Sequence, residues 1–146
     1  MELFKQMTEQ EYIKSRVDNQ ISWYSKKAST NKLLNLGTKS LIIAFSATIP
    51  LLAGVEFSAI AKNITLGVLG SLIAILSGLS GLLKFQEKWA EYRTTSETLK
   101  HEKILFQTNS GPYSEEVEAF KLLVTRIENL ISKEHSAWSQ YINKEN

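Results

Sequence analysis

Residues 63–83 read NITLGVLGSLIAILSGLSGLL, a run of 21 residues without a charged side chain. A helix of this length is about 31 Å long, which matches the roughly 30 Å hydrocarbon thickness of a bilayer. A second uncharged run, residues 40–55, is shorter, but Lys39 can snorkel and let the preceding leucines extend it. The two runs predict transmembrane helices over 40–55 and 63–83, joined by a short external loop, 56–62.

The composition of the whole chain hides this segregation. The 146 residues fit one small domain, and 43% hydrophobic and 22% charged residues are ordinary for a water-soluble protein. However, the apolar residues are concentrated in the middle, and both flanks are dense in Lys and Glu. A buried hairpin in a soluble helical bundle is the alternative, although neither run has the polar face that a soluble helix needs.

Lysine and arginine residues near the apolar runs predict the orientation. Four precede the first run and five follow the second, whereas the connecting loop has only Lys62. Both termini are therefore expected on the cytoplasmic side of a multi-pass protein. About forty residues, many charged, precede the first run, far more than a secretory signal peptide allows. The chain has no cysteine, so no disulfide framework is predicted.

Three further helical segments are expected outside the membrane. The first, 8–37, begins with a capping box of Thr8 and Glu11 and ends near Gly37, which suits a helix stop or hinge. The second continues the 63–83 helix as one rod to about residue 108. The third, 114–142, follows a break at residues 109–112.

Each of these segments has an apolar stripe at helical spacing. The stripes consist of Ile13, Val17, Ile21, Tyr24 and Ala28; of Phe85, Trp89, Tyr92, Ser96, Leu99, Lys103 and Phe106; and of Val117, Phe120, Val124, Ile127, Ile131 and Trp138. The last helix is expected to start at Ser114, with Glu115, Glu116 and Glu118 placed favourably against its dipole. Three amphipathic stripes require one another, so we expect an all-α membrane protein in which a two-transmembrane helical hairpin carries a cytoplasmic helical bundle.

Small residues gather on one face of the 63–83 helix. Placed at 100° per residue, its glycines and most of its serines fall within an arc of about 120°, and large aliphatic residues cover the remainder. In lipid, such a face predicts close approach to another helix. The functional alternative is that this face borders a water-filled path in a homo-oligomer. The candidate interface or pore-lining residues are Ser46, Thr48, Pro50, Gly67, Gly70, Ser71, Ala74, Ser77, Gly78 and Gly81.

Pro50 and Glu56 each have both a functional and a purely structural interpretation. Pro50 removes a backbone hydrogen bond and should kink the first span, which is compatible with gating and equally with static packing. Glu56 is a pore-mouth candidate, because a ring of carboxylates in an oligomer would attract cations, whereas a single loop glutamate is more often just solvated.

Enzymatic chemistry finds no support in the sequence. His101 and His135 are lone histidines on charged helices, and no zinc spacing, phosphate loop or nucleophile elbow occurs. We therefore expect no catalytic residues, no metal and no cofactor. A net charge of +2 spread over helices of mixed sign gives no reason to expect nucleic acid as a partner.

The segment KFQEKWAEYRTTSETLKHEKILFQTNSGPY, residues 84–113, resembles the signature of the SLATT superfamily, two-transmembrane effector domains of bacteria. Supporting pieces are DNQISWYSKKA at 18–28 and RIENLISKEHSAWSQ at 126–140. The signature residues are Trp23, Trp89, Tyr92, Arg93, Glu97, Lys100, Glu102, Tyr113 and Trp138, together with Thr95 and Leu99.

This resemblance implies a homo-oligomeric effector of bacterial conflict or defence systems in the inner membrane, which forms pores or otherwise perturbs the bilayer. It implies a trigger from a nucleotide-signalling sensor protein or from its product. The other function class is a membrane-anchored helical adaptor, whose bundle docks a soluble partner while the spans only tether it.

Overall fold

The computed structural model describes residues 7–56, 58–115 and 117–142, and side chains as far as Lys133. All regular structure in these ranges is helical. The chain divides into two compact units. One consists of residues 1–26 and 92–146, and we call it the bundle unit; the other, residues 27–91, is the hairpin unit.

The first helix begins where the capping box predicts. The Thr8 hydroxyl accepts a hydrogen bond from the Glu11 backbone N–H at 3.3 Å, and the Glu11 carboxylate accepts one from the Thr8 N–H at 2.9 Å. Helix α1 (Glu9–Tyr12) leads through a π-helical turn, η1 (Ile13–Val17), directly into α2 (Asp18–Ala53). The predicted start at Thr8 is therefore confirmed.

The predicted helix end near Gly37 is wrong. Helix α2 continues through this glycine and joins the predicted segments 8–37 and 40–55 into one helix that ends at Ala53. A glycine inside a helix costs only about 1 kcal/mol, and no proline or turn sequence follows Gly37 to end the helix there. The helix contains Pro50 in its last turn.

The expected continuous rod from residue 63 to about 108 is also interrupted. Helix α3 (Ala59–Leu83) ends at Lys84, which has the left-handed dihedrals φ 47° and ψ 42°, and α4 (Phe85–Gln107) begins immediately after it. The left-handed conformation costs an L-residue roughly 1–2 kcal/mol. Two long helices therefore meet at one strained lysine, although the sequence pattern predicted an unbroken helix there.

Helix α4 ends in the predicted break. Asn109 is left-handed, its N–H donates to the Phe106 carbonyl at 3.1 Å, and the Ser110 N–H donates to the Leu105 carbonyl at 2.9 Å. These two bonds form a Schellman motif, which satisfies carbonyls that the helix leaves unpaired. A short 3-10 helix, η2 (Gly111–Tyr113), follows.

The last helix, α5 (Ala119–Ile142), starts later than the predicted Ser114. The η2 turn directs Tyr113 into the core, where its side chain is buried, and this delays the helix. Glu115 and Glu118 precede α5 instead of lying in its first turn, and Glu116 falls outside the described residues. Val117, predicted in the apolar stripe, is almost fully exposed because it also precedes the helix.

The core of the bundle unit confirms most of the predicted stripes. Val17 and Tyr24 from η1 and α2, Leu99 from α4, and Ile127 and Ile131 from α5 are buried in one cluster. Leu123, which the predicted stripe of α5 omitted, is fully buried there as well. Ser96 is also fully buried, and its hydroxyl lies 2.7 Å from that of Ser25.

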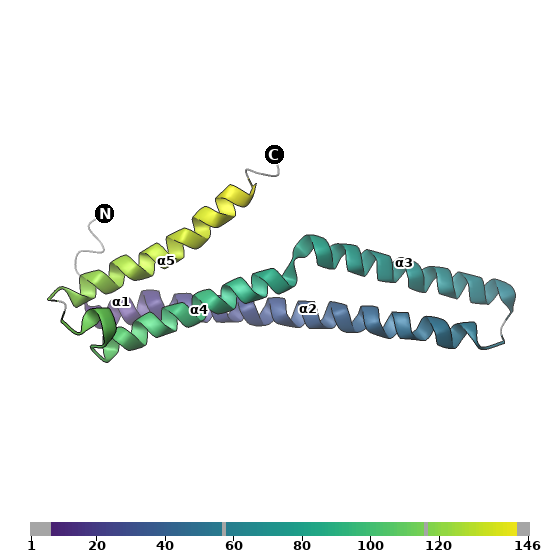
Figure 1. Cartoon of the computed structure of the whole chain (residues 1–146), viewed down its shortest axis with the longest axis horizontal. Coiled ribbons are helices and arrows are strands. Elements are labelled where there is room, and N and C mark those ends of the chain that lie inside the picture. Colours follow the sequence, from purple (N-terminus) through teal and green to yellow (C-terminus); the bar gives the residue numbers. More distant parts are fainter. Residues whose placement is uncertain (1–6, 57, 116, 143–146) are drawn as a thin grey trace. The chain divides into compact units, whose positions relative to one another are not determined.

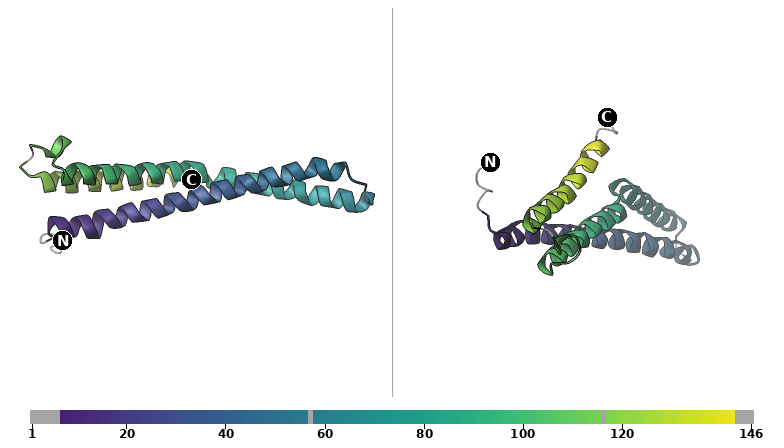
Figure 2. Two further views of the ribbon diagram at one scale, coloured as in Figure 1. Left: turned by 90° about the horizontal axis from the view of Figure 1, so that it is seen from below. Right: turned by 60° about the vertical axis from the view of Figure 1, so that its left-hand side comes forward.

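The hairpin unit pairs the second part of α2 with α3. Figures 1 and 2 show these segments running antiparallel as neighbours, connected at one end by residues 54–58. Both α2 and α3 are long and apolar enough to cross a membrane, and none of the residues in their apolar windows is buried. The two predicted spans are thus present as helices.

Candidate functional site

Helix α3 has three different faces within the hairpin unit. The residues that α2 partly covers are large and aliphatic for the most part, and they follow one another at steps of three and four: Leu66, Leu69, Ile73, Leu76 and Ser80. We call them the leucine seam. The predicted small-residue face lies elsewhere on the helix, and all of its members are exposed: Gly67, Gly70, Ser71, Ala74, Ser77, Gly78 and Gly81.

The glycines of this small-residue face have open space in front of them in the described chain. A Cβ atom built on Gly67, Gly70, Gly78 or Gly81 would meet no side chain, nor any backbone outside its own helical turns, within 4 Å. The glycines are therefore not needed for the packing of α3 against α2. Since a small-residue face in lipid serves close helix approach, the surface that the sequence predicted for helix contact is unoccupied in the hairpin itself.

A third face of α3 is covered with large aliphatic residues that are also exposed. It consists of Val68, Leu72, Ile75, Leu79 and Leu82, with exposed fractions between 40% and 80%. Helix α2 adds exposed Leu41, Ile43 and Leu51. Monomeric water-soluble proteins rarely expose so many large apolar side chains on neighbouring helices, and such exposure points to contact with a membrane or another protein.

Two of the candidate pore-lining hydroxyl groups are bonded to their own helices. The Ser71 hydroxyl donates to the Gly67 carbonyl at 2.9 Å, and the Thr48 hydroxyl donates to the Ala44 carbonyl at 2.8 Å. Such bonds to the preceding turn satisfy a hydroxyl in an apolar medium. Of the remaining pore-lining candidates, Ser46 and Pro50 are exposed and Thr48 is half-buried.

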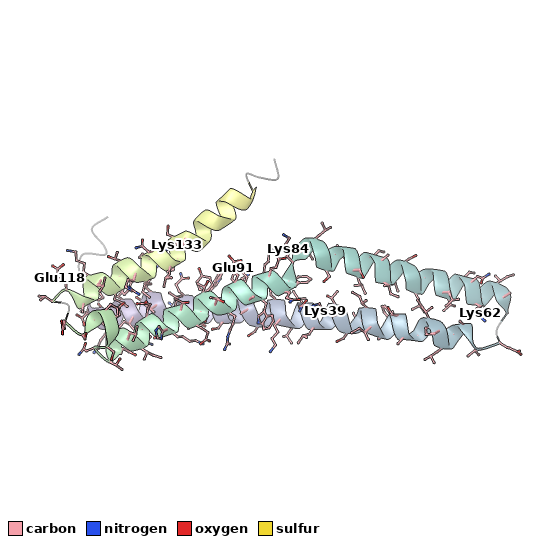
Figure 3. All side chains as sticks on the ribbon, viewed as in Figure 1. Lys39, Lys62, Lys84, Glu91, Glu118 and Lys133 are labelled. Atoms are coloured by element: carbon pink, nitrogen blue, oxygen red, sulfur yellow. The ribbon has the colours of Figure 1, made fainter. Side chains whose placement is uncertain are left out.

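Lysines mark both ends of the hairpin, as the side-chain view shows (Figure 3). Lys62 donates from its ammonium to the Ala53 carbonyl at 2.6 Å, so the first turn of α3 caps the end of α2. At the other end the Lys39 ammonium donates to the Gln86 side-chain oxygen at 2.7 Å, and the Lys32 ammonium lies 5.7 Å from the centre of the Trp89 ring. The pore-mouth candidate Glu56 is exposed in the connecting loop.

A buried carboxylate organises the bundle unit. Glu102 is 5% exposed and accepts hydrogen bonds from Arg126 Nε at 2.8 Å, from Arg126 Nη2 at 2.5 Å and from the Tyr113 hydroxyl at 2.6 Å. The hydrogen bonds from Arg126 are the main cause that lowers the pKa of Glu102, against the effect of burial. This network ties α5 and the η2 turn to α4.

A second network of the same composition ties α5 to the N-terminal helices. Glu128 accepts two hydrogen bonds from Arg16, at 3.0 and 2.9 Å, and one from the Tyr12 hydroxyl at 3.1 Å. Arg16 thereby lowers the pKa of Glu128, and burial raises the pKa of Tyr12. A groove of about 510 Å³ lies beside this network, lined by Tyr12, Arg16, Glu128 and neighbouring apolar residues of α5.

The signature residues are distributed unevenly over these features. Glu102 and Tyr113 share the buried network, which also includes Arg126, a residue that the sequence did not predict there. Trp23 and Tyr92 form an edge-to-face pair with ring centres 5.9 Å apart. Arg93, Glu97 and Lys100 form exposed ion pairs along one side of α4. The Trp138 side chain lies outside the described residues.

The histidines are not brought together with other ligands. His101 is exposed on α4, and the side chain of His135 lies outside the described residues. Within the described part of the chain, no group of three or more His, Cys, Asp or Glu side chains could hold a metal ion.

Comparison with known proteins matches one family model, described as "Protein of unknown function (DUF4231)", over residues 19–121. The matched region begins near the start of α2, includes α3, α4 and η2, and ends in the first turn of α5. No protein with a curated description and no solved structure matches the chain.

Proposed function

The chain belongs to the DUF4231 family, and from this premise we propose that it is a self-assembling two-transmembrane protein of a bacterial cell membrane. In this proposal α2 and α3 cross the bilayer, and the protein acts as a pore-forming or channel-like effector without catalytic residues. Both termini and the bundle unit lie on the cytoplasmic side, where lysines and arginines are concentrated.

Exposure of the apolar helices supports membrane insertion. The core helix of a soluble protein would be largely buried, whereas no residue of α3 is. The stretch between Lys62 and Lys84 is long enough to cross the roughly 30 Å hydrocarbon layer. Most exposed residues of α3 are either large aliphatic groups suited to lipid or members of the small-residue face.

The observation that carries the assembly proposal is the unoccupied small-residue face. The leucine seam already packs on α2, so the glycine face of α3 is available to a second copy of the chain. Close approach of these faces in several copies would place Ser71 and Ser77 near the centre of the assembly. Hydroxyl groups there can line a water-filled path.

The resemblance to the SLATT superfamily supports an effector role in a conflict or defence system. On that basis the trigger would come from a nucleotide-signalling sensor protein, or from its product bound to the bundle unit. The alternative function, a membrane-anchored adaptor, is favoured by the groove beside Tyr12 and Arg16, which offers a soluble partner a site on the bundle unit.

The test is reconstitution of the purified protein in lipid bilayers, with permeability to ions and the detergent-solubilised mass measured on the same sample. We expect a defined oligomer with discrete currents, both lost in Gly70→Leu. Thr65→Leu is the matched control, because Thr65 lies on the aliphatic face of α3. Equal mass and equal currents in the two variants would reject the interface. If the protein keeps its activity after its hairpin is replaced by unrelated transmembrane helices, the adaptor function is favoured.

A further inference from the structure

The residues covered on α3 and on the start of α4 are out of phase with each other. The leucine seam ends at Ser80, and the next half-buried residues are Phe85 and Trp89. At 100° per residue, Phe85 would lie about 140° around the axis from Ser80 in an unbroken helix. The left-handed Lys84 lies between them, and it allows both sets to be covered in the same hairpin unit.

The small-residue face, in contrast, is in phase with α4. Counted through an unbroken helix, Gly67, Ala74, Gly78 and Gly81 fall within about 40° of Phe85. Tyr92, Ser96, Leu99 and Lys103, four of the buried and half-buried residues that follow on α4, fall within the same arc, whereas the buried Glu102 lies about 100° from Phe85. On an unbroken helix the glycine face would therefore continue into this part of the packed face of α4, and the conformation of Lys84 divides the two.

The sequence around the break does not require it. Residues 82–90 contain neither glycine nor proline, and they consist largely of good helix formers. In the broken form two side chains of α2 contact the start of α4: Lys39 contacts Gln86, and Lys32 lies over Trp89. An unbroken helix would relieve the left-handed lysine and give up the packing of the leucine seam.

We propose that Lys84 is the switch point between two packings of α3 on α2. In the broken form, which the structure shows, the leucine seam faces α2 and the glycine face is free. In the straight form α3 is rotated by about 140°, so that the glycine face packs on α2 and the leucine seam faces lipid. Because lipid provides no hydrophobic force that distinguishes these faces, the two packings can be close in free energy.

The effect of this switch on assembly rests on the proposed function. If the glycine face is the assembly surface, the straight form hides it within the monomer and the broken form presents it to other copies. The conformation of one lysine at the end of the apolar run would then control assembly. The switch itself is a property of a single chain and can be measured without any oligomer or current.

The experiment uses cysteine crosslinking in membranes, since the natural chain has no cysteine. One cysteine replaces Phe45, a half-buried residue of α2, and the second replaces either Ile73 or Ala74. These neighbours lie at the same depth but on the leucine seam and the glycine face, respectively. The readout is the ratio of intrachain crosslinking through position 73 to that through position 74, taken from the monomer band.

Two substitutions at the switch point shift the ratio in opposite directions. Lys84→Gly removes the cost of the left-handed conformation, so we expect a ratio about tenfold higher than with lysine. Lys84→Val makes that conformation sterically worse, so we expect crosslinking to move toward position 74. A cysteine pair at Ser25 and Ser96 in each variant reports whether the bundle unit is intact, because their hydroxyls lie 2.7 Å apart.

Ratios that are equal in the lysine, glycine and valine proteins, with the Ser25–Ser96 pair still forming, would overturn the switch. Crosslinks between chains are scored separately, as dimer bands. Their absence together with a responsive intrachain ratio would reject the assembly proposal and keep the switch. Dimer bands together with an intrachain ratio that does not change between the variants would reject the switch and keep the assembly proposal.

Discussion

The Lys62 ammonium lies 2.6 Å from the carbonyl oxygen of Ala53, so the first turn of α3 satisfies the last turn of α2. The same ammonium is 3.4 Å from the Val55 carbonyl oxygen. These two carbonyls lie at the closed end of the hairpin, where the helix leaves its final oxygens without backbone donors. One lysine thereby joins the two helices at the end that we place outside the membrane.

Lys62→Ala is expected to destabilise the hairpin by about 1 kcal/mol, the usual value of a hydrogen bond, because the Ala53 carbonyl loses its donor. Lys62→Arg should recover most of the loss. The measurement is resistance to unfolding in increasing sodium dodecyl sulfate, followed by far-ultraviolet circular dichroism. Equal resistance of the alanine variant and the natural protein would show that the bond does not stabilise the hairpin.

Glu102→Gln is expected to loosen α5 from α4. The substitution removes the charge from a buried carboxylate and leaves Arg126 without its partner, which costs about 1–3 kcal/mol in the free energy of unfolding. Glu97→Gln is the matched control on the same helix, because Glu97 is exposed with Arg93 and Lys100, and it should change stability little. Thermal unfolding of both variants, followed by tryptophan fluorescence, compares them directly. Similar losses in the two would contradict the role given to the buried network.

Acid should weaken the attachment of α5. The pKa values of Glu102 and Glu128 are lowered in the folded protein, mainly by hydrogen bonds from Arg126 and Arg16. A carboxyl group whose folded pKa is depressed contributes stability that is present above its unfolded pKa, about 4.3, and is lost as the pH falls through the folded value. The temperature at the midpoint of thermal unfolding should therefore decrease as the pH is lowered below about 4.3. The double variant Glu102→Gln, Glu128→Gln should show a flatter dependence, and an unchanged slope would contradict the assignment.

The orientation can be tested with single cysteines in right-side-out membrane vesicles. Glu56→Cys lies in the loop that we place outside, and an impermeant maleimide should label it without permeabilisation. Glu91→Cys, at the other end of the hairpin unit, should be labelled only after the vesicles are opened. Labelling of both positions in intact vesicles, or of Glu91→Cys alone, would reject a cytoplasmic location of both termini.

The elements that depend on local sequence were predicted well. The Thr8 capping box, the break at residues 109–112 and the two apolar helices each follow from the nature of neighbouring side chains. Gly37 and Ser114 misled the prediction because each has a local preference that the surrounding structure overrides. At Gly37 a long helix continues at modest cost, and after Pro112 the burial of Tyr113 delays α5.

The apolar residues on either side of Lys84 indicate a break in the helix, although the lysine itself does not. The leucine seam of α3 and the Phe85–Trp89 face of α4 are about 140° apart, and this mismatch requires a break if both face one partner. The glycine face concealed it, because that face continues smoothly into α4. The ion networks could not be predicted, since Arg16 and Glu128 are 112 positions apart and only the tertiary structure pairs them.

Crosslinking of a single cysteine at position 74 shows whether the small-residue faces of two chains meet in the membrane. In membranes containing Ala74→Cys as the only cysteine, the free glycine face of one chain should meet that of another, and oxidation should give a strong dimer band. Thr65→Cys, on the aliphatic face of the same helix, should give little. Equal dimer yields from the two positions, or none from position 74, would contradict assembly through the small-residue face.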